Sequence, residues 1–383
     1  KKIRCLVLQF NQQNMSLKIT LTKILVPLVS ASLLVACSNN SGAQLHESKN
    51  LNLNFKNRTL VSEIFTADPS AHIFENRIYI YASHDIESGG IEDDSGNHFN
   101  MIDYHVLSMN LDGSDVTVHP VALSVDDVEW AESKFWAPDA AFKNGKYYLY
   151  YPAKDKDNIF KLGVAVSDHP EGPFTPQPEP MKGSYSIDPA VFVDDDGSAY
   201  LYFGGIWGGQ LQRWKNGSYD KNGSLKDLGV PDAPSIMPRM AKLTDDMLEF
   251  SEEVQIIDIL DEYGNPILTK DLERRFFEAP WIHKYEGVYY MSYSTGDTHL
   301  IAYATSDNPY GPFVYQGTMH EPVQGWTNHH STLKVADQWY FFYHDIELSG
   351  KTHLRNVKFT SFDHNSDGSI DPIKTYFGSD FRF

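Results

Sequence analysis

Cysteine is nearly absent from this sequence, because only Cys5 and Cys37 occur and both lie near the N-terminus. The rest of the chain therefore has no disulfide framework, no cysteine metal site and no cysteine nucleophile. Basic residues are also scarce, since 32 Lys and Arg stand against 51 Asp and Glu and the net charge is −19. Nucleic acid is excluded as a partner, because phosphate binding needs a basic surface.

The sequence also lacks any long segment with convincing helical periodicity. Of its 383 residues, 13% are aromatic and 41% are hydrophobic. The hydrophobic content is enough for a packed core, which excludes disorder as a description of the whole chain. Aromatic residues favour strands and aromatic-lined pockets, so the composition indicates a β-rich globular protein.

The first 37 residues have the layout of a secretory signal. Lys18 and Lys23 precede an apolar run over residues 24–36, which is shorter than the roughly 20 residues of a membrane-spanning helix. A buried apolar helix is the alternative. Residues 1–14 precede a plausible start at Met15, and we expect them to lie upstream of the true start. Residues 38–56 predict a polar tether, and residues 57–383 predict one folded domain.

One sequence unit occurs five times between Ala67 and Tyr343. Each copy has a small or acidic residue, often next to Pro, followed by an apolar strand, a turn and an aromatic-rich strand. The copies begin at Ala67, Trp136, Ile187, Glu278 and Asn328. Hairpin turns are predicted at residues 75–76, 144–145, 194–197, 286–287 and 336–337. Five similar antiparallel sheets predict an all-β fold, a five-bladed β-propeller; an irregular β-sandwich is the alternative.

Three copies carry a carboxylate at their start, namely Asp68, Asp188 and Glu278. An acid next to Pro is also common as a turn or cap residue, but three acids in register in one repeat indicate a shared role. At the start of inner strands they would point into the axial cavity of a propeller. Glycoside hydrolysis needs such a set: one acid protonates the leaving oxygen and another activates water or attacks. Trp136 and Trp207 could stack on sugar faces.

The sequence resembles glycoside hydrolase family 43 over about residues 60–375. The resemblance is carried by residues 67–72, 185–192, 277–281 and 328–331, and it implies a five-bladed propeller that hydrolyses with inversion. It further implies that Asp68 is the general base and Glu278 the general acid. Asp188 is then a third acid that orients Glu278 and keeps its pKa high, because a neighbouring carboxylate disfavours ionisation.

The resemblance also assigns two residues outside the acid set. It places His329 on the axis near a bound calcium ion or a water cluster, although a purely structural role stays open because one imidazole is a sparse cage for a hard cation. His330 alternates to the opposite strand face and is expected to pack. Arg355 matches a family arginine near the third acid, where it could bind a sugar hydroxyl or set the charge of Asp188. A surface salt bridge is the alternative for Arg355.

Residues 34–37 resemble the lipobox of bacterial lipoproteins. The resemblance implies that Cys37 is lipidated and becomes the mature N-terminus. It further implies a location in the bacterial cell envelope, at the outer membrane or in the periplasm. We therefore expect contact with a membrane only through a lipid anchor.

The function that the resemblance implies is that of an exo-β-D-xylosidase acting on xylo-oligosaccharides during hemicellulose degradation. Residues 207–214 and 274–278 look most like the xylosidase-rich branch of the family. An α-L-arabinofuranosidase, or an enzyme with both activities on arabinosylated xylan fragments, is the alternative because the two pentoses present similar hydroxyls. A non-catalytic sugar-binding lipoprotein is a third possibility, against which the retention of all three acids argues.

Overall fold

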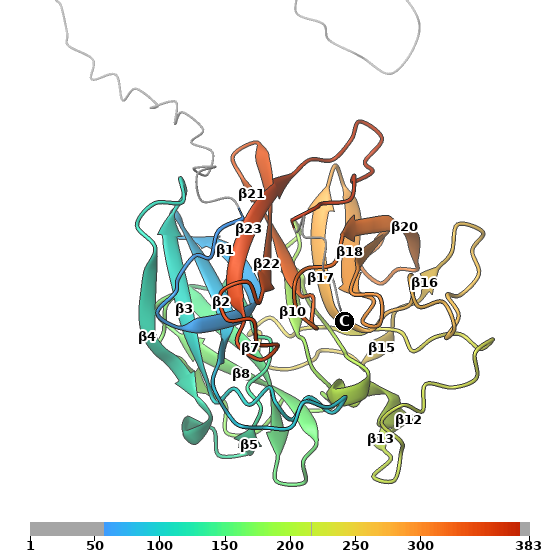
Figure 1. Ribbon diagram of the computed structural model, residues 1–383, viewed down its shortest axis with the longest axis horizontal. Coiled ribbons are helices and arrows are strands. Elements are labelled where there is room, and N and C mark those ends of the chain that lie inside the picture. Colours follow the sequence, from blue (N-terminus) through green and yellow to red (C-terminus); the bar gives the residue numbers. More distant parts are fainter. Residues whose placement is uncertain (1–56, 216, 376–383) are drawn as a thin grey trace, which may run out of the picture. The chain divides into compact units, whose positions relative to one another are not determined.

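The computed structural model describes residues 57–215 and 217–375. These residues form antiparallel sheets arranged as the five blades of a β-propeller (Figure 1), which confirms the predicted fold. Within these two ranges the helices are three single-turn 3₁₀ segments, and none has the length and hydropathy to cross a membrane. Cys5, Cys37, the predicted signal and the predicted tether lie outside the described residues.

Blades one and two are each built by consecutive segments of chain. Blade one contains, in spatial order, β1 (Phe65–Phe74), β2 (Arg77–Asp85), β3 (Asp103–Asn110) and β4 (Thr117–Ser124). Blade two contains β5 (Ala131–Ser133), β6 (Asp139–Lys143), β7 (Lys146–Asp155), β8 (Phe160–Ser167) and β9 (Thr175–Pro176). In blade two, β7 pairs with both β5 and β6.

Blades three to five continue the same order. Blade three contains β10 (Ala190–Val193), β11 (Ala199–Phe203), β14 (Arg239–Lys242) and β15 (Gln255–Ile256), with a separate hairpin of β12 (Trp214–Lys215) and β13 (Ser218–Tyr219). Blade four contains β17 (Glu278–Tyr285), β18 (Val288–Ser294), β19 (Ile301–Ser306), β20 (Phe313–His320) and the parallel β16 (Ile259–Leu260). Blade five contains β21 (His330–Val335), β22 (Gln338–Asp345) and β23 (Asn356–Phe362). The five predicted hairpin turns lie between β1 and β2, β6 and β7, β10 and β11, β17 and β18, and β21 and β22.

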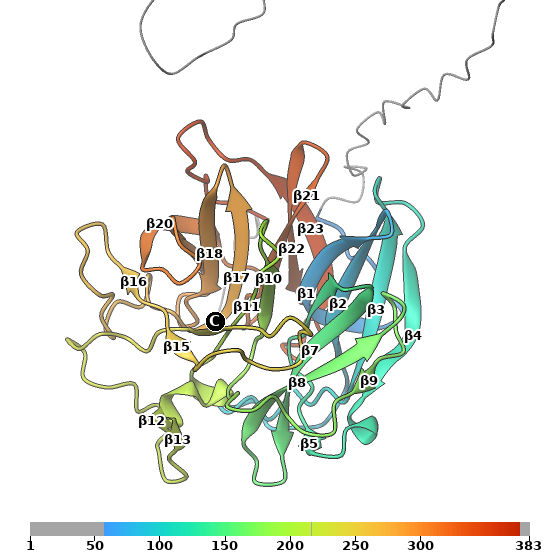
Figure 2. The same cartoon turned by 180° about the vertical axis from the view of Figure 1, so that it is seen from behind.

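Blade five is completed by the start of the described chain. The backbone N–H of Asn57 donates to the carbonyl of Phe359 at 2.8 Å, and that of Leu60 donates to Val357 at 3.0 Å. Because β23 lies near the other end of the sequence, these bonds close the ring. Figures 1 and 2 both show β1 and β2, in blue, beside β21–β23, in red.

The hydrophobic core lies in layers between neighbouring blades. Ile78 and Ile80 of β2 pack in one cluster with Phe359 of blade five, whereas Tyr79 and Tyr81 pack in another with residues of blade two. This period of two is the alternation of a strand that is buried on both faces. Each fully buried side chain of this size stabilises the fold by roughly 1.5–3 kcal/mol. The core therefore fixes the blades and leaves the starts of the inner strands for the axis.

The acidic motif of the repeat forms a bulge in the inner strand. The β1–β2 register shifts between Ala67 and Ser70, and Asp68 has a φ of +53°. Asp188 has a φ of +56° and Ala279, after Glu278, one of +57°. Left-handed backbone is uncommon for residues other than Gly, above all before Pro, and it costs on the order of 1–3 kcal/mol per residue. Bulges of this kind re-aim side chains, here toward the propeller axis.

Candidate active site

The starts of the five inner strands line one cavity. Blades one to five contribute Asp68, Trp136, Asp188, Glu278 and His329 in that order. Trp207 and Arg355 line the same cavity. The structure therefore brings together every cavity residue that the sequence predicts, while their chemical roles stay predictions.

Asp68 is a buried carboxylate whose two oxygens and backbone N–H all form hydrogen bonds. Its Oδ1 accepts from Arg355 Nη1 at 2.9 Å and its Oδ2 accepts from Ser83 Oγ at 2.6 Å. Its backbone N–H donates to Nδ1 of His344 at 3.0 Å. Burial favours the neutral acid, but Arg355 and then His344 outweigh it and lower the pKa of Asp68 to about 2. Asp68 is therefore ionised at neutral pH and can accept a proton.

Arg355 connects Asp68 to a second buried acid, Asp85. Its Nε and Nη2 donate to the two oxygens of Asp85, each at 2.8 Å. Because the Arg355 side chain is only 3% exposed, a surface salt bridge is excluded. Arg355 forms ion pairs with Asp68 and Asp85. Its charge also opposes the rise in the pKa of Asp188, the third acid near which the resemblance places it. This position follows from the fold, because Arg355 directly precedes β23 and its carbonyl accepts from the backbone N–H of Thr66 in blade one at 2.9 Å.

Asp188 is a buried acid and Glu278 a partly buried one, and both have raised pKa values. Burial, and then the charge of Asp68, raises the pKa of Glu278 to about 8. Burial, and then repulsion from Glu278, raises the pKa of Asp188 well above its ordinary value. Repulsion between Asp188 and Glu278 acts on both carboxyl groups and disfavours the second ionisation of the pair. Asp188 Oδ2 accepts from the N–H of Ala279 at 2.9 Å, which fixes the backbone beside Glu278 and agrees with the orienting role.

The two neighbouring histidines of blade five have different surroundings. His329 lines the cavity with Nε2 3.9 Å from Asp188 Oδ2, and both its ring nitrogens are buried without a hydrogen-bond partner among the described residues. Buried polar groups normally have partners, so water or a cation fits this position. His330 is fully buried, contacts Phe341 with ring centroids 5.1 Å apart and bonds Ser292 Oγ at 2.5 Å. His330 therefore packs, as the strand alternation predicts.

The two predicted tryptophans form part of the cavity wall. Trp136 is held by a hydrogen bond of 2.9 Å from Nε1 to the carbonyl of Phe99. Gly96 makes room for it, because a Cβ at that position, where φ is +71°, would lie 2.7 Å from the indole ring. Trp207 meets the ring of Phe277 edge-on, with centroids 5.2 Å apart. Both indoles therefore have fixed positions against which a sugar ring could stack.

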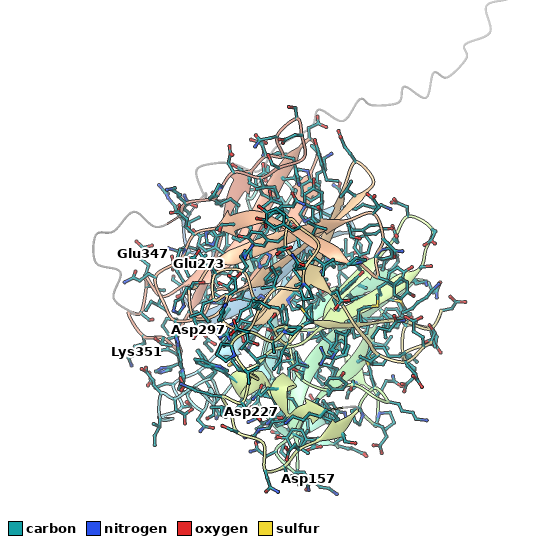
Figure 3. The ribbon with its side chains drawn as sticks, turned by 90° about the vertical axis from the view of Figure 1, so that its right-hand side faces the viewer. Asp157, Asp227, Glu273, Asp297, Glu347 and Lys351 are labelled. Carbon is teal, nitrogen blue, oxygen red and sulfur yellow. The ribbon has the colours of Figure 1, made fainter. Side chains whose placement is uncertain are left out.

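Several residues of the site have no counterpart in the sequence prediction. Asp85 accepts hydrogen bonds from Arg355, and His344 accepts one from the backbone N–H of Asp68. Thr327 accepts a hydrogen bond from Arg355 Nη1 at 3.1 Å. The loop over residues 86–102, between β2 and β3, adds further wall residues, and Asp297 from blade four lines the cavity and pairs with Arg275. Figure 3 labels Asp297, together with Glu347 and Lys351 of the loop between β22 and β23. Among these residues, only Asp85 has a feature in the sequence that indicates a functional role: it is an acid at the end of a long apolar strand.

The chain matches known proteins over the whole propeller. The model of glycosyl hydrolases family 43 matches residues 58–370. A xylosidase/arabinosidase of Humicola insolens is 57% identical over 318 residues, which cover 81% of this chain and 97% of that protein. A xylosidase/arabinosidase of Bacteroides ovatus is 52% identical over 321 residues, covering 83% and 97%.

Solved structures agree with these relatives. A family 43 β-xylosidase/α-arabinofuranosidase from a compost microbial metagenome, in complex with xylotriose and in a calcium-free form, has a TM-score of 0.83 and 61% identity; the match covers 84% of this chain and 98% of that one. A family 43 enzyme of Xanthomonas citri with xylotriose has a TM-score of 0.79 and 52% identity, covering 84% and 94%. The resemblance of the motifs is thereby confirmed across the full domain, and this chain is a glycosidase that belongs to glycosyl hydrolases family 43.

Proposed function

We propose that the protein is an inverting exo-β-D-xylosidase that removes xylose from the non-reducing ends of xylo-oligosaccharides, with α-L-arabinofuranosidase activity as a second reaction. The observation that carries the proposal is that two acids of one cavity have opposite pKa shifts: the pKa of Asp68 is lowered to about 2 and that of Glu278 is raised to about 8. A relative that is 57% identical is named for both activities, and two similar structures hold xylotriose.

In the proposed reaction, Asp68 takes a proton from a water molecule as the water oxygen forms a bond to the anomeric carbon. Glu278 donates its proton to the glycosidic oxygen as the old bond breaks. Asp188 holds Glu278 in place through the N–H of Ala279, and Arg355 keeps Asp68 ionised. Water attacks from the side opposite the leaving group, so the configuration inverts. Both acids then exchange protons with solvent.

A panel of substrates tests this function. We expect hydrolysis of xylobiose, of an aryl β-D-xyloside and, more slowly, of an aryl α-L-arabinofuranoside. NMR during the first turnovers should show α-xylose, the inverted anomer. A β-xylose product would overturn the inverting mechanism, and faster turnover of the arabinofuranoside would reverse the order of the two activities. A non-catalytic sugar-binding protein would turn over none of the three.

The pH dependence follows from the two pKa shifts. Glu278 must be protonated, so kcat/KM is expected to fall as the pH rises through about 8. Asp68 must be ionised, and it stays so until the pH approaches about 2. Because its folded pKa lies below its unfolded value, Asp68 also contributes stability that is present above the unfolded pKa of about 3.9 and lost below it. Rates measured from acid to alkaline pH, with circular dichroism as a control for folding, check this; an alkaline limb near pH 5 would contradict it.

We also propose a divalent cation, calcium, near His329. The proposal is supported by the two unpartnered ring nitrogens of His329 and by the carboxylate of Asp188 at 3.9 Å. When bound, such an ion supplies positive charge on the axis, which would favour the ionised forms of nearby acids. His329 and the waters around it would hold the ion, while Asp68 and Glu278 carry out the proton transfers described above.

Chelation is expected to lower the activity, and added calcium is expected to restore it. His329→Ala should lose this response and most of the activity, because the site loses its imidazole. His330→Ala should mainly lower the melting temperature, because His330 packs against Phe341. Rates before and after exhaustive dialysis against a chelator check this. If dialysis and calcium both leave the rate unchanged, His329 has a structural or water-binding role.

We propose further that Cys37 is lipidated and anchors the protein in a bacterial cell envelope. The support is the apolar run over residues 24–36 followed by Cys37. Cys37→Ser is expected to move the protein from the membrane fraction to the soluble fraction with unchanged specific activity, because the propeller starts about 20 residues later. Fractionation followed by an activity assay checks this. Continued membrane attachment would indicate an uncleaved apolar anchor instead.

A further inference from the structure

Three potential metal ligands gather at one end of β2 and β3, away from the catalytic cavity. His84, Asp103 and His105 each offer one ligand atom, and these three atoms lie within 4.8 Å of one another. Among residues 57–215 and 217–375 this is the one group of three or more His, Cys, Asp or Glu side chains with that property. None of the three lines the cavity.

The strand register explains why these side chains meet. Ala82 pairs with His105 and Ser83 pairs with Tyr104, so the next step along the ladder places His84 opposite Asp103. Residues directly opposite each other, and residues two apart on one strand, point to the same face of a sheet. The His84 and His105 rings have centroids 4.8 Å apart, and His84 Nδ1 lies 2.6 Å from Asp103 Oδ1. The backbone itself therefore builds the cluster.

The hydrogen bonds leave nitrogen lone pairs available. His105 Nδ1 lies 2.8 Å from the carbonyl oxygen of His119. A carbonyl only accepts, so Nδ1 carries the hydrogen and the neutral ring keeps a lone pair on Nε2. Histidines that bind metals usually have such an outer hydrogen bond, which fixes the tautomer and the ring orientation. The side chains of His84 and Asp103 are 19% and 17% exposed, so an ion from solvent can reach them.

We propose that His84, Asp103 and His105 bind a zinc ion, with water as the fourth ligand. Two imidazoles and one carboxylate are a ligand set that zinc accepts, with a tetrahedral site completed by water. Zinc–ligand distances are about 2.0–2.2 Å, so binding draws the three groups closer together, which partly exposed side chains permit. Calcium prefers oxygen ligands, so two imidazoles and a single carboxylate suit zinc better than calcium.

The proposed zinc site lies beside residues that bond groups of the active site. Ser83 and Asp85 alternate with His84 along β2, and they bond Asp68 and Arg355. Tyr104, between Asp103 and His105, donates its hydroxyl to the carbonyl of Trp136 at 2.7 Å. An ion shared by β2 and β3 would cross-link the two strands at the end that holds these groups. Zinc is therefore expected to stabilise the folded protein, because it binds the folded state alone.

Calorimetric titration of the tag-free protein with zinc, after treatment with a chelator and its removal, tests the proposal. We expect one zinc ion per chain and a melting temperature that rises with zinc. Asp103→Asn and His105→Ala should each weaken binding by more than the roughly 10–100-fold that loss of an outer-shell partner costs. The matched control is His169→Ala, an exposed histidine of blade two that should bind zinc like the parent.

A third variant, His84→Gln, tests folding and zinc binding together. His84→Gln, which keeps a polar side chain at the site, should fold, retain the basal activity of the metal-free parent and show no rise in melting temperature with zinc. Cobalt bound to the parent should give a visible absorption band that His84→Gln lacks. Absence of saturable zinc binding, or equal binding by the parent and the three variants, would overturn the proposal. Loss of zinc binding in His329→Ala alone would place the ion on the axis instead.

Discussion

Replacing Glu278 by Gln is expected to slow the hydrolysis of xylobiose by roughly 10²–10⁴-fold, the usual contribution of a general acid. A glutamine side chain has the size of glutamate, but it cannot give a proton to the departing xylose oxygen. An aryl xyloside with an acidic nitrophenol leaves as a stable anion, so its hydrolysis should lose far less. The ratio of the two losses, measured as kcat/KM, isolates the proton donation.

Glu273→Gln is the matched control for this experiment. Glu273 lies five residues earlier on an exposed part of the chain, as Figure 3 shows, and its replacement should leave both rates unchanged. The same neutral substitution then differs only in its place in the fold. A rate on xylobiose that is unchanged in Glu278→Gln would remove Glu278 from the role of acid.

Replacing Asp68 by Asn is expected to cost roughly 10²–10⁴-fold on xylobiose and on the nitrophenyl xyloside alike. The proposed base acts on water, so its loss does not depend on the leaving group. Asparagine suits this position because it tolerates the left-handed backbone of residue 68 better than alanine does. Its amide oxygen can also accept the hydrogen bond from Ser83.

Azide gives a second readout for the same variant. Azide attacks without the help of a base, so it should restore turnover of the nitrophenyl xyloside and give the inverted azide product. Asp157→Asn, in an exposed turn (Figure 3), should behave like the parent. If Asp68→Asn slowed xylobiose alone, Asp68 would have to act on the leaving group, and the assignment of the two acids would be reversed.

The blades could be predicted because their signals are local. Asn144–Gly145 between two apolar segments indicates a hairpin by itself, and β6 and β7 do meet there. The repeat then aligned Asp68, Asp188 and Glu278 at the starts of inner strands, and all three reach one cavity. Strand periodicity likewise separated His329 from His330. The repeated sequence pattern therefore predicts both the fold and the positions of the three main acids.

The groups that shift the pKa values of these acids could not be predicted in the same way. Asp85 and Arg355 are 270 residues apart and belong to the first and last blades, so no local spacing connects them. Motif matching identified Arg355 but not the acid that it pairs with, because that depends on which strands meet where the ring closes. The causes of the raised pKa of Glu278 likewise depend on burial and on the placement of Asp68 across the cavity.

The closure of the ring also determines when activity can first appear during protein synthesis. Asp68 lies in the first blade, and its partner Arg355 follows 287 residues later, just before the strand that bonds Asn57 and Leu60. A ribosome must therefore release nearly the whole domain before the base acquires its counter-charge. Contacts so distant in sequence form slowly, so the nascent chain passes through a long period with complete early blades and no functional centre. A chain that is truncated before Arg355 cannot assemble this pair at all.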